Sequence, residues 1–136
     1  MHKNFIFKTK VYYEDTDAGG VVYYANYLKF IERARTEVIK ELGFSNNILI
    51  NDYDTFFVVK SCNLDFKKYA YLEDELNVNS SIVYISKTSF KMLQEITREN
   101  QIIFSSLVHL VAINKNGKII KIPQLFQNKL QSFLSK

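Results

Sequence analysis

The sequence predicts an α+β fold in which one long helix packs against an antiparallel sheet. A helical pattern of apolar residues spans 24–42, and a strand pattern at 5–13 precedes it. Four further strand patterns, separated by short turns, follow the helix. An amphipathic helix needs a sheet or a second helix over its apolar face, so this order of elements suits a sheet wrapped around a central helix.

The expected helix carries a broad apolar stripe. At 3.6 residues per turn, one face collects Tyr27, Leu28, Phe30, Ile31, Ala34, Val38, Ile39 and Leu42. Arg35 falls inside this arc, and because an inward guanidinium must be paired, we expect Glu32 or an upstream aspartate to hold it, with a direct role on substrate as the alternative. Gly43 is the expected C-cap of the helix.

Alternation and turn signals place the other elements. We expect a connecting segment at 44–53, followed by strands at 55–66, 74–86, 87–98 and 101–114. Short turns such as the one at 98–101 make the later strands antiparallel neighbours. The last strand is apolar on both faces, which favours a central place in the sheet or a place at an interface. A turn at Asn116-Gly117 and a C-terminal helix over 125–134 complete the chain.

Composition and charge indicate one domain, 1–136, with a large apolar core. Hydrophobic residues make up 47% of the 136 positions, with 11 Phe and 9 Tyr but only 4 Gly and 1 Pro. That usage is typical of long regular elements with few irregular loops. The net charge of +4 suits an anionic ligand and is too small to indicate nucleic acid as a partner.

Cysteine usage and hydropathy bear on the compartment. Cys62 is the lone cysteine, so the chain has no disulfide framework and a reducing cytosol is favoured. The first ten residues lack the apolar core of a signal peptide, and no run approaches the roughly 18 apolar residues of a membrane span. We therefore expect a cytoplasmic protein without stable membrane insertion.

The loop before the helix carries the candidate chemistry. Glu14, Asp15 and Asp17 lie just upstream of Gly19-Gly20, where the chain can turn sharply and approach a ligand closely. The start of a helix follows, and its unpaired N–H groups favour developing negative charge. A carboxylate placed here can attack a carbonyl or activate water while backbone donors hold the oxyanion. Capping and turn formation are the alternative role for the same residues.

The same stretch resembles the signature of the hotdog-fold acyl-CoA thioesterases. Residues 12–23 read YYEDTDAGGVVY, and similar positions follow at 25–27, 30 and 32–37. More narrowly, the motif resembles the YbgC-type enzymes linked to the bacterial Tol-Pal envelope system, which are relatives of 4-hydroxybenzoyl-CoA thioesterase. Weaker similarity at 56–60, 69–74 and 87–89 extends the resemblance over most of the chain.

The resemblance implies a hotdog fold, with a five-stranded antiparallel sheet wrapped around one long central helix and a short C-terminal helix. It implies an acyl-CoA substrate and a thioester hydrolase that needs no cofactor. A homodimer or homotetramer is expected, because one such sheet covers its helix on only one side and leaves its edges open. Tol-Pal-linked or lipid-synthesis proteins are candidate partners.

Carried over by position, the family's catalytic carboxylate falls on Asp17, which would act as nucleophile or general base. The backbone N–H that polarises the thioester carbonyl falls at or next to Tyr24. The YbgC-type pattern usually has His at that position, so Tyr24 is a departure that leaves a phenol or the backbone alone to assist. Gly20 and Val22 lie between Asp17 and Tyr24 and are expected to border the substrate.

Two tyrosines and a group of lysines are the candidate lining of the substrate pocket. Tyr13 and Tyr27 are the expected walls, although buried tyrosines more often belong to a core. Phosphates of CoA need cations outside the pocket, and Lys60 is a candidate together with Lys67, Lys68, Lys87 and Lys91.

Other classes of protein fit the residues less well. Hotdog dehydratases typically use an inward histidine, and His2 and His109 both lie outside the loop and helix. One cysteine and two separated histidines cannot form a local zinc site, so no metal is expected. The stronger alternative is a non-catalytic acyl-thioester binder or a scaffold of an envelope or lipid-synthesis complex, which the departure at Tyr24 favours.

Overall fold

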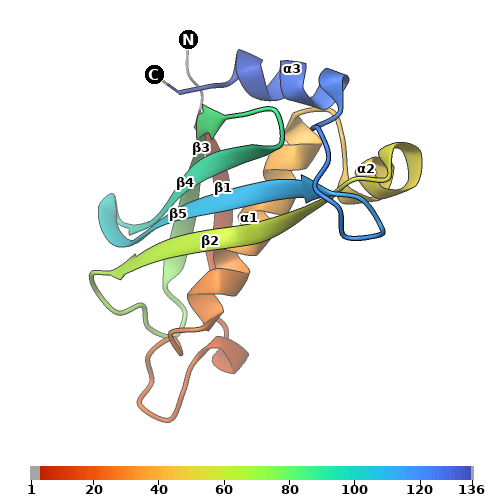
Figure 1. The fold of residues 1–136 in the computed structure, drawn as a ribbon. Coiled ribbons are helices and arrows are strands. Elements are labelled where there is room, and N and C mark those ends of the chain that lie inside the picture. The colour runs from red at the N-terminus through yellow and green to blue at the C-terminus, as the bar shows by residue number, and fades with distance from the viewer. Residues whose placement is uncertain (1–3, 136) are drawn as a thin grey trace.

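A computed structural model describes residues 4–135, and His2 lies outside them. Within this range, one long helix packs against a five-stranded antiparallel sheet, as the sequence predicts. The strands are β1 (Phe5–Lys10), β2 (Phe56–Phe66), β3 (Glu75–Ile85), β4 (Ser89–Arg98) and β5 (Gln101–Ile113). The helices are α1 (Asn26–Glu41), α2 (Asn46–Tyr53) and α3 (Gln124–Ser132), and a short 3-10 helix covers Tyr13–Asp15 (Figure 1).

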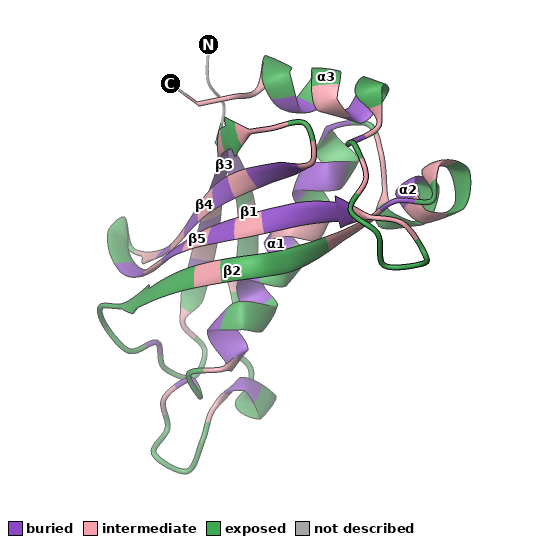
Figure 2. Cartoon of the chain, in the orientation of Figure 1, coloured by how far each residue is buried: buried purple, intermediate pink, exposed green. Residues whose placement is uncertain are grey.

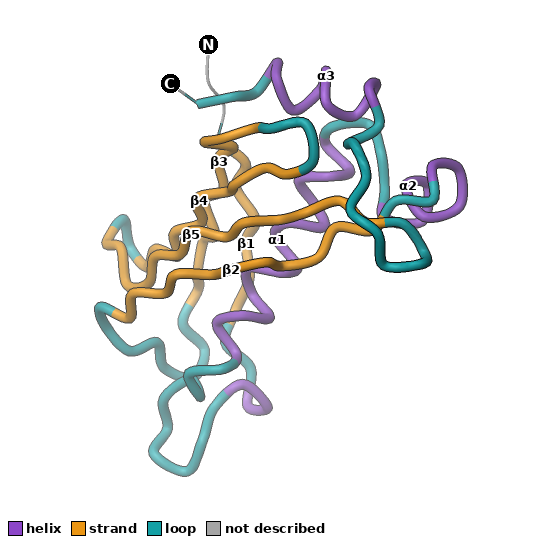
Figure 3. The backbone as a smooth tube through the Cα atoms, viewed as in Figure 1, coloured by secondary structure: helices purple, strands orange, loops and turns teal. Residues whose placement is uncertain are grey.

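The sheet has the strand order β1-β3-β4-β5-β2, and each neighbouring pair is antiparallel. β5 lies between β4 and β2, which confirms the central place that its apolar faces favour. β1 and β2 are the two edge strands. Figure 3 shows α1 running along one face of this sheet, with α3 across one end.

Helix α1 supplies the centre of the core. Its buried residues include Tyr27, Phe30, Ile31, Ala34, Val38 and Ile39, all from the predicted stripe. The prediction for Leu28 is wrong, because its side chain is 42% exposed. Leu28 shares a helical row with Glu32 and Arg35, and those two residues line a cleft beside β2 that the sheet does not close.

Two segments differ from the sequence prediction. The connecting segment 44–53 contains α2, which begins because the Ser45 hydroxyl accepts a hydrogen bond from the N–H of Ile48 at 3.1 Å. The buried side chain of Leu49 anchors this short helix. β1 ends at Lys10, because Val11 leaves β3 and exchanges hydrogen bonds with the Glu73-Asp74 turn.

The C-terminal end of α1 is closed as the sequence predicts. Gly43 has φ +88°, and its N–H donates to the Lys40 carbonyl at 3.0 Å. The N–H of Phe44 donates to the Ile39 carbonyl at 3.1 Å, which completes a Schellman motif. The Phe44 ring then packs edge to face on Phe126 of α3, at 5.1 Å between centroids.

Burial is uneven across the sheet. Figure 2 shows β2 largely exposed beside a largely buried β5. Apolar side chains on β2 remain partly open to solvent, among them Val58, Val59, Leu64 and Phe66. Within residues 4–135, no helix is both long and apolar enough to cross a membrane.

Candidate functional site

The loop before α1 folds into a small hairpin that presents Asp17. Thr16 forms an antiparallel bridge with Val22, and the N–H of Asp17 donates to the Val21 carbonyl at 2.9 Å. The turn closes when the N–H of Gly20, at φ +81°, donates to the Asp17 carbonyl at 3.0 Å. This conformation explains a glycine at position 20, because residues with a Cβ rarely adopt it.

The three loop carboxylates have different environments. Asp15 is buried: its carboxylate accepts the N–H of Tyr12 at 2.9 Å, so it stabilises the 3-10 turn. Glu14 and Asp17 are exposed. One oxygen of Asp17 accepts the N–H of Gly19 at 2.9 Å, which fixes the orientation of the carboxylate and leaves its other oxygen open to solvent.

The start of α1 lies directly after this hairpin. The carbonyl of Asp15 accepts both the N–H of Tyr23, at 3.0 Å, and the side-chain amide of Asn26, at 2.8 Å. Within residues 4–135, the backbone N–H groups of Tyr24 and Ala25 donate no hydrogen bond, and no side chain caps the helix. Open N–H groups at the positive end of a helix dipole are suited to bind an anion or a polarised carbonyl oxygen.

A pocket of about 280 Å³ opens beside this helix start. Its walls come from the hairpin, from α1, and from the end of β2 with the loop that follows. The lining residues are Val22, Tyr24, Tyr27, Phe66, Lys67, Lys68 and Tyr69. The pocket therefore has apolar and aromatic walls with two cationic side chains, a composition that suits an apolar group attached to an anion.

Tyr24 and Tyr27 line this pocket in different ways. The phenol of Tyr24 is 64% exposed, and its ring packs against Tyr23, at 4.8 Å, and edge-on to Phe66, at 6.4 Å. Tyr27 is buried, stacks on Phe104 at 5.1 Å, and accepts the N–H of Ala70 through its hydroxyl at 3.0 Å. Burial raises the pKa of Tyr27 although the Ala70 N–H opposes the shift, so Tyr27 is a neutral wall of the pocket.

Other predicted site residues lie outside this pocket. Gly20 forms the hairpin turn, and Tyr13 is 82% exposed on the 3-10 helix. Lys60 is exposed at a bulge in β2. The pKa of His109 is lowered first by burial and then by the charges of Lys91 and Lys60. The substrate-binding roles of Tyr13 and Lys60 stay predictions.

Arg35 is held by a different partner from the one expected. Its Nη1 donates to the side-chain oxygen of Gln94, a fully buried residue of β4, at 3.1 Å. Gln94 in turn donates to the carbonyl of Ile31 at 2.9 Å. Burial lowers the pKa of Arg35, and the nearby charge of Glu32 opposes that shift without forming an ion pair within 4.0 Å. Arg35 thus ties α1 to the sheet.

The loop that follows β2 completes the site. The N–H of Val22 donates to the Ala70 carbonyl at 2.9 Å, and Val21 forms a bridge with Tyr71. Sequence reasoning missed Phe66, Tyr69 and Ala70 as parts of the site. Weak motif similarity at 69–74 was the only signal for Tyr69 and Ala70, and Phe66 had none, because pairing between segments distant along the chain brings these residues here. Among residues 4–135, no cluster of three His, Cys, Asp or Glu side chains could hold a metal ion.

Comparison with known proteins places these features in a family. The model of the thioesterase superfamily matches residues 19–104. The acyl-CoA thioesterase YbgC of Haemophilus influenzae is 36% identical over 114 residues, which cover 84% of each chain. The YbgC protein of Helicobacter pylori is 34% identical over 135 residues, covering 92% of this chain and 98% of that protein.

A solved structure supports the same placement. The crystal structure of a probable thioesterase from Bartonella henselae superimposes with a TM-score of 0.86 at 32% identity, and the match covers 89% of this chain and 100% of that one. The family match runs from the glycines of the hairpin through α1 to β5. The fold is therefore the hotdog fold, and the chain belongs to the thioesterase superfamily, among the relatives of the YbgC proteins.

Proposed function

We propose that this protein hydrolyses the thioester bond of an acyl-CoA and that Asp17 is its catalytic carboxylate. The observation that carries the proposal is the hairpin, which holds an exposed, oriented carboxylate directly before a helix start with open N–H groups. Kinship with YbgC thioesterases points to the same reaction. Asp17 either attacks the thioester carbonyl, releasing the CoA thiolate and forming an anhydride that water cleaves, or removes a proton from attacking water.

The oxyanion of either route needs donors that are already in place. The N–H groups of Tyr24 and Ala25 supply them, because neither is used within the described chain and both lie at the positive end of α1. The backbone can perform this task whatever side chain stands at position 24. The phenol of Tyr24 then serves as a wall of the pocket, packed on Phe66.

Lys67 and Lys68, the two lysines at the pocket, are better placed for CoA phosphates than Lys60. Their backbone N–H groups both donate to the Ile103 carbonyl, at 2.9 and 3.1 Å, so the loop start is fixed against β5. Lys67 forms an exposed ion pair with Asp65 at 2.9 Å, whereas Lys68 makes no ion pair among residues 4–135. An ammonium group without an ion pair to the described residues is a suitable point charge for a phosphate.

The test is release of free thiol from short, long and aromatic acyl-CoAs by wild type and Asp17→Asn. Asparagine keeps a side-chain oxygen for the N–H of Gly19, so the hairpin should survive while the charge is lost. We expect the rate to fall by about a hundredfold or more, as is usual for loss of a general base or nucleophile. Glu14→Gln removes a second exposed carboxylate of the same loop and serves as the matched comparison.

The outcomes separate the alternatives. Loss of rate in Asp17→Asn but not in Glu14→Gln supports Asp17 as the catalytic carboxylate. Release that survives in Asp17→Asn would move the chemistry to another group. If wild type binds acyl-CoA but releases no thiol from any substrate, the protein is an acyl-thioester binder and the hydrolase proposal fails.

We also propose that the protein works as a homo-oligomer joined through β2. This strand is an edge of the sheet with unpaired backbone groups, and it exposes apolar side chains on both faces, Val59 and Leu64 on one and Val58 on the other. Pairing with β2 of a second copy would satisfy the edge and cover these side chains. Because β2 ends at the pocket, the partner would lie near the substrate.

Light scattering during size-exclusion chromatography tests this arrangement. We expect at least a dimer at micromolar concentration, and a Val59→Lys variant should shift the mass toward the monomer because it places a charge on the proposed interface. A wild-type monomer at that concentration would contradict the proposal.

A further inference from the structure

The segment 69–71 is the structural partner of the catalytic hairpin. Ala70 is fully buried, and its carbonyl accepts the N–H of Val22 at 2.9 Å. Its N–H donates to the hydroxyl of Tyr27 at 3.0 Å. One residue of this segment therefore holds both the strand that leads from Asp17 to α1 and a wall of the pocket.

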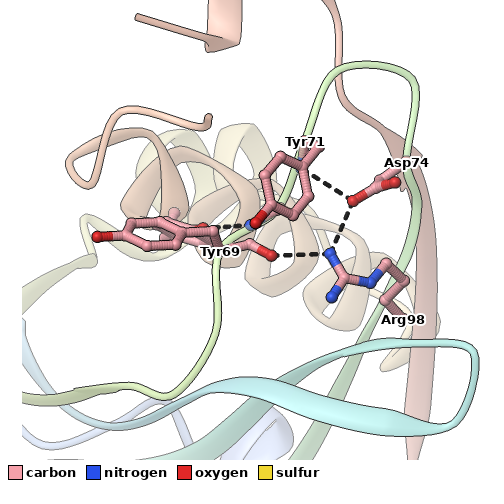
Figure 4. A network of polar contacts seen from close by, with 6 residues as sticks. Tyr69, Tyr71, Asp74 and Arg98 are labelled. Carbon is pink, nitrogen blue, oxygen red and sulfur yellow. Dashed lines mark hydrogen bonds and ion pairs between the residues drawn. The ribbon is translucent and has the colours of Figure 1, made fainter. Parts of the chain in front are cut away.

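Arg98 at the end of β4 holds this segment in turn (Figure 4). Its Nη1 donates to the Tyr69 carbonyl at 2.7 Å and to a carboxylate oxygen of Asp74 at 2.8 Å. The same oxygen of Asp74 accepts the N–H of Tyr71 at 2.8 Å. The guanidinium also lies 5.8 Å from the centroid of the Tyr71 ring. Arg98 is thus bonded, directly or through Asp74, to the residues on both sides of Ala70.

This ion pair is more sheltered than the other one in the described chain. The side chains of Arg98 and Asp74 are 19% and 24% exposed, whereas those of Lys67 and Asp65 are 44% and 65% exposed. Sheltered, charge-assisted hydrogen bonds hold geometry better than exposed pairs, which water and salt screen. The start of the loop is fixed on β5 and its end on Val11, just after β1, so Arg98 secures the part between them.

We propose that Arg98, through Asp74, is a positioning residue for the hydrolysis. It holds segment 69–71 in place, and Ala70 passes that constraint to Val22 and Tyr27. The result is a fixed register between the Asp17 hairpin and the N–H groups at the start of α1. This inference rests on the proposed function of Asp17. Arg98 itself does not line the pocket, so its effect should fall on the reaction step more than on substrate binding.

The test compares kcat, KM and amide hydrogen exchange in Arg98→Ala, Arg98→Lys and Asp74→Asn, each measured below its unfolding transition. We expect Arg98→Ala to lower kcat by about ten- to a hundredfold, because small misplacements of reacting groups have effects of that size. KM should change less than kcat, because the substitution removes no substrate contact. Lysine restores the charge and one donor group, so Arg98→Lys should recover part of kcat. Exchange at the N–H of Val22 should accelerate.

Gln127→Ala is the matched structural control. Gln127 of α3 also donates a long-range hydrogen bond to a backbone carbonyl, that of Ser86, at 3.0 Å, at the opposite end of the molecule. We expect it to lower the melting temperature while leaving kcat and Val22 exchange unchanged.

Two results would overturn the inference. The first is an unchanged kcat in Arg98→Ala together with wild-type exchange at Val22. The second is a loss of kcat in Gln127→Ala as large as in the Arg98 variants. If Arg98→Ala fails to fold, Arg98→Lys and Asp74→Asn decide by the same criteria. Asp17→Asn measured in parallel distinguishes the two proposals. If this variant keeps its activity, the role of Asp17 is refuted, whatever the result for the Arg98 variants.

Discussion

The two ends of helix α1 are built in opposite ways. At the C-terminal end, Gly43 and Phe44 return their N–H groups to the last turn, and Phe44 packs on Phe126. At the N-terminal end, no side chain among residues 4–135 caps the helix, and none of these residues accepts the N–H groups of Tyr24 and Ala25, which lie beside a pocket. One end satisfies its polar groups and buries its rings, whereas the other leaves donors free for a ligand.

This difference separates stability from function along a single helix. Open donors cost stability, because a helix end without partners is less favourable than a capped one. Here the start of α1 is held by Asp15, whose carbonyl accepts the side-chain amide of Asn26, and by Ala70, which is hydrogen-bonded to Val22 and Tyr27. Substitutions at the C-terminal end should therefore change the free energy of unfolding, and substitutions at the N-terminal end should change the rate of reaction.

The largest effect on stability is expected for Phe126→Ala. Its ring is fully buried and lies 5.1 Å from Phe44 and 5.4 Å from Phe57, so truncation leaves a cavity among aromatic rings. The free energy of unfolding should fall by about 3 to 5 kcal/mol in urea titrations. Thiol release per folded molecule should stay at the wild-type level. A comparable loss of kcat in folded protein would mean that the two ends are coupled.

A smaller effect, on both properties, is expected for Tyr27→Phe. The substitution keeps the ring stacked on Phe104 but leaves the buried N–H of Ala70 without its acceptor. The unfolding free energy should fall by about 1 to 3 kcal/mol, and kcat should fall with it because Ala70 also holds Val22. Tyr53→Phe is the control, since its ring packs on Phe44 at the other end and its hydroxyl makes no hydrogen bond within residues 4–135. Equal stability of the two variants would contradict this role for the Tyr27 hydroxyl.

The sharpest comparison uses two glycines with nearly the same conformation. Gly20 and Gly43 have φ +81° and +88°, and a Cβ built on either meets no atom within 4 Å. Alanine at either position should lower the unfolding free energy by about 1 to 2 kcal/mol through backbone strain alone. Only Gly20→Ala should lower the rate of thiol release, because it distorts the hairpin that carries Asp17. A loss of rate in Gly43→Ala as well would show that strain at either end reaches the site.

The sequence predicts the regular elements well because their signals are local. The apolar stripe of α1 and the alternation in β3 and β4 each lie within one element, and packing follows them. α2 is missed because Asn46 and Asn47 are weak helix formers and three consecutive apolar residues, Ile48 to Ile50, show no period. Leu28 is misassigned because the helical period defines the arc but not how far the sheet reaches around it.

The residues of the candidate site also differ in whether a local sequence pattern predicts them. Asp17, Gly20 and Val22 are neighbours along the chain, so a motif can name them together. The partners that hold them come from tertiary pairing at long range. Arg35 meets Gln94 across 59 positions, and Tyr27 meets Ala70 across 43. No local sequence pattern identifies these long-range partners. The side chain of Ala70 also carries no functional group that would suggest a role in the site.

Segment 69–71 acts on the site through its peptide groups, and this has an evolutionary consequence. The Tyr69 carbonyl meets Arg98, and both peptide groups of Ala70 are engaged, while the Tyr69 side chain faces the pocket. Any residue at position 69 offers the same carbonyl. The side chain there can therefore vary without loss of this contact, and under the proposed function such variation would change the acyl group that the pocket accepts.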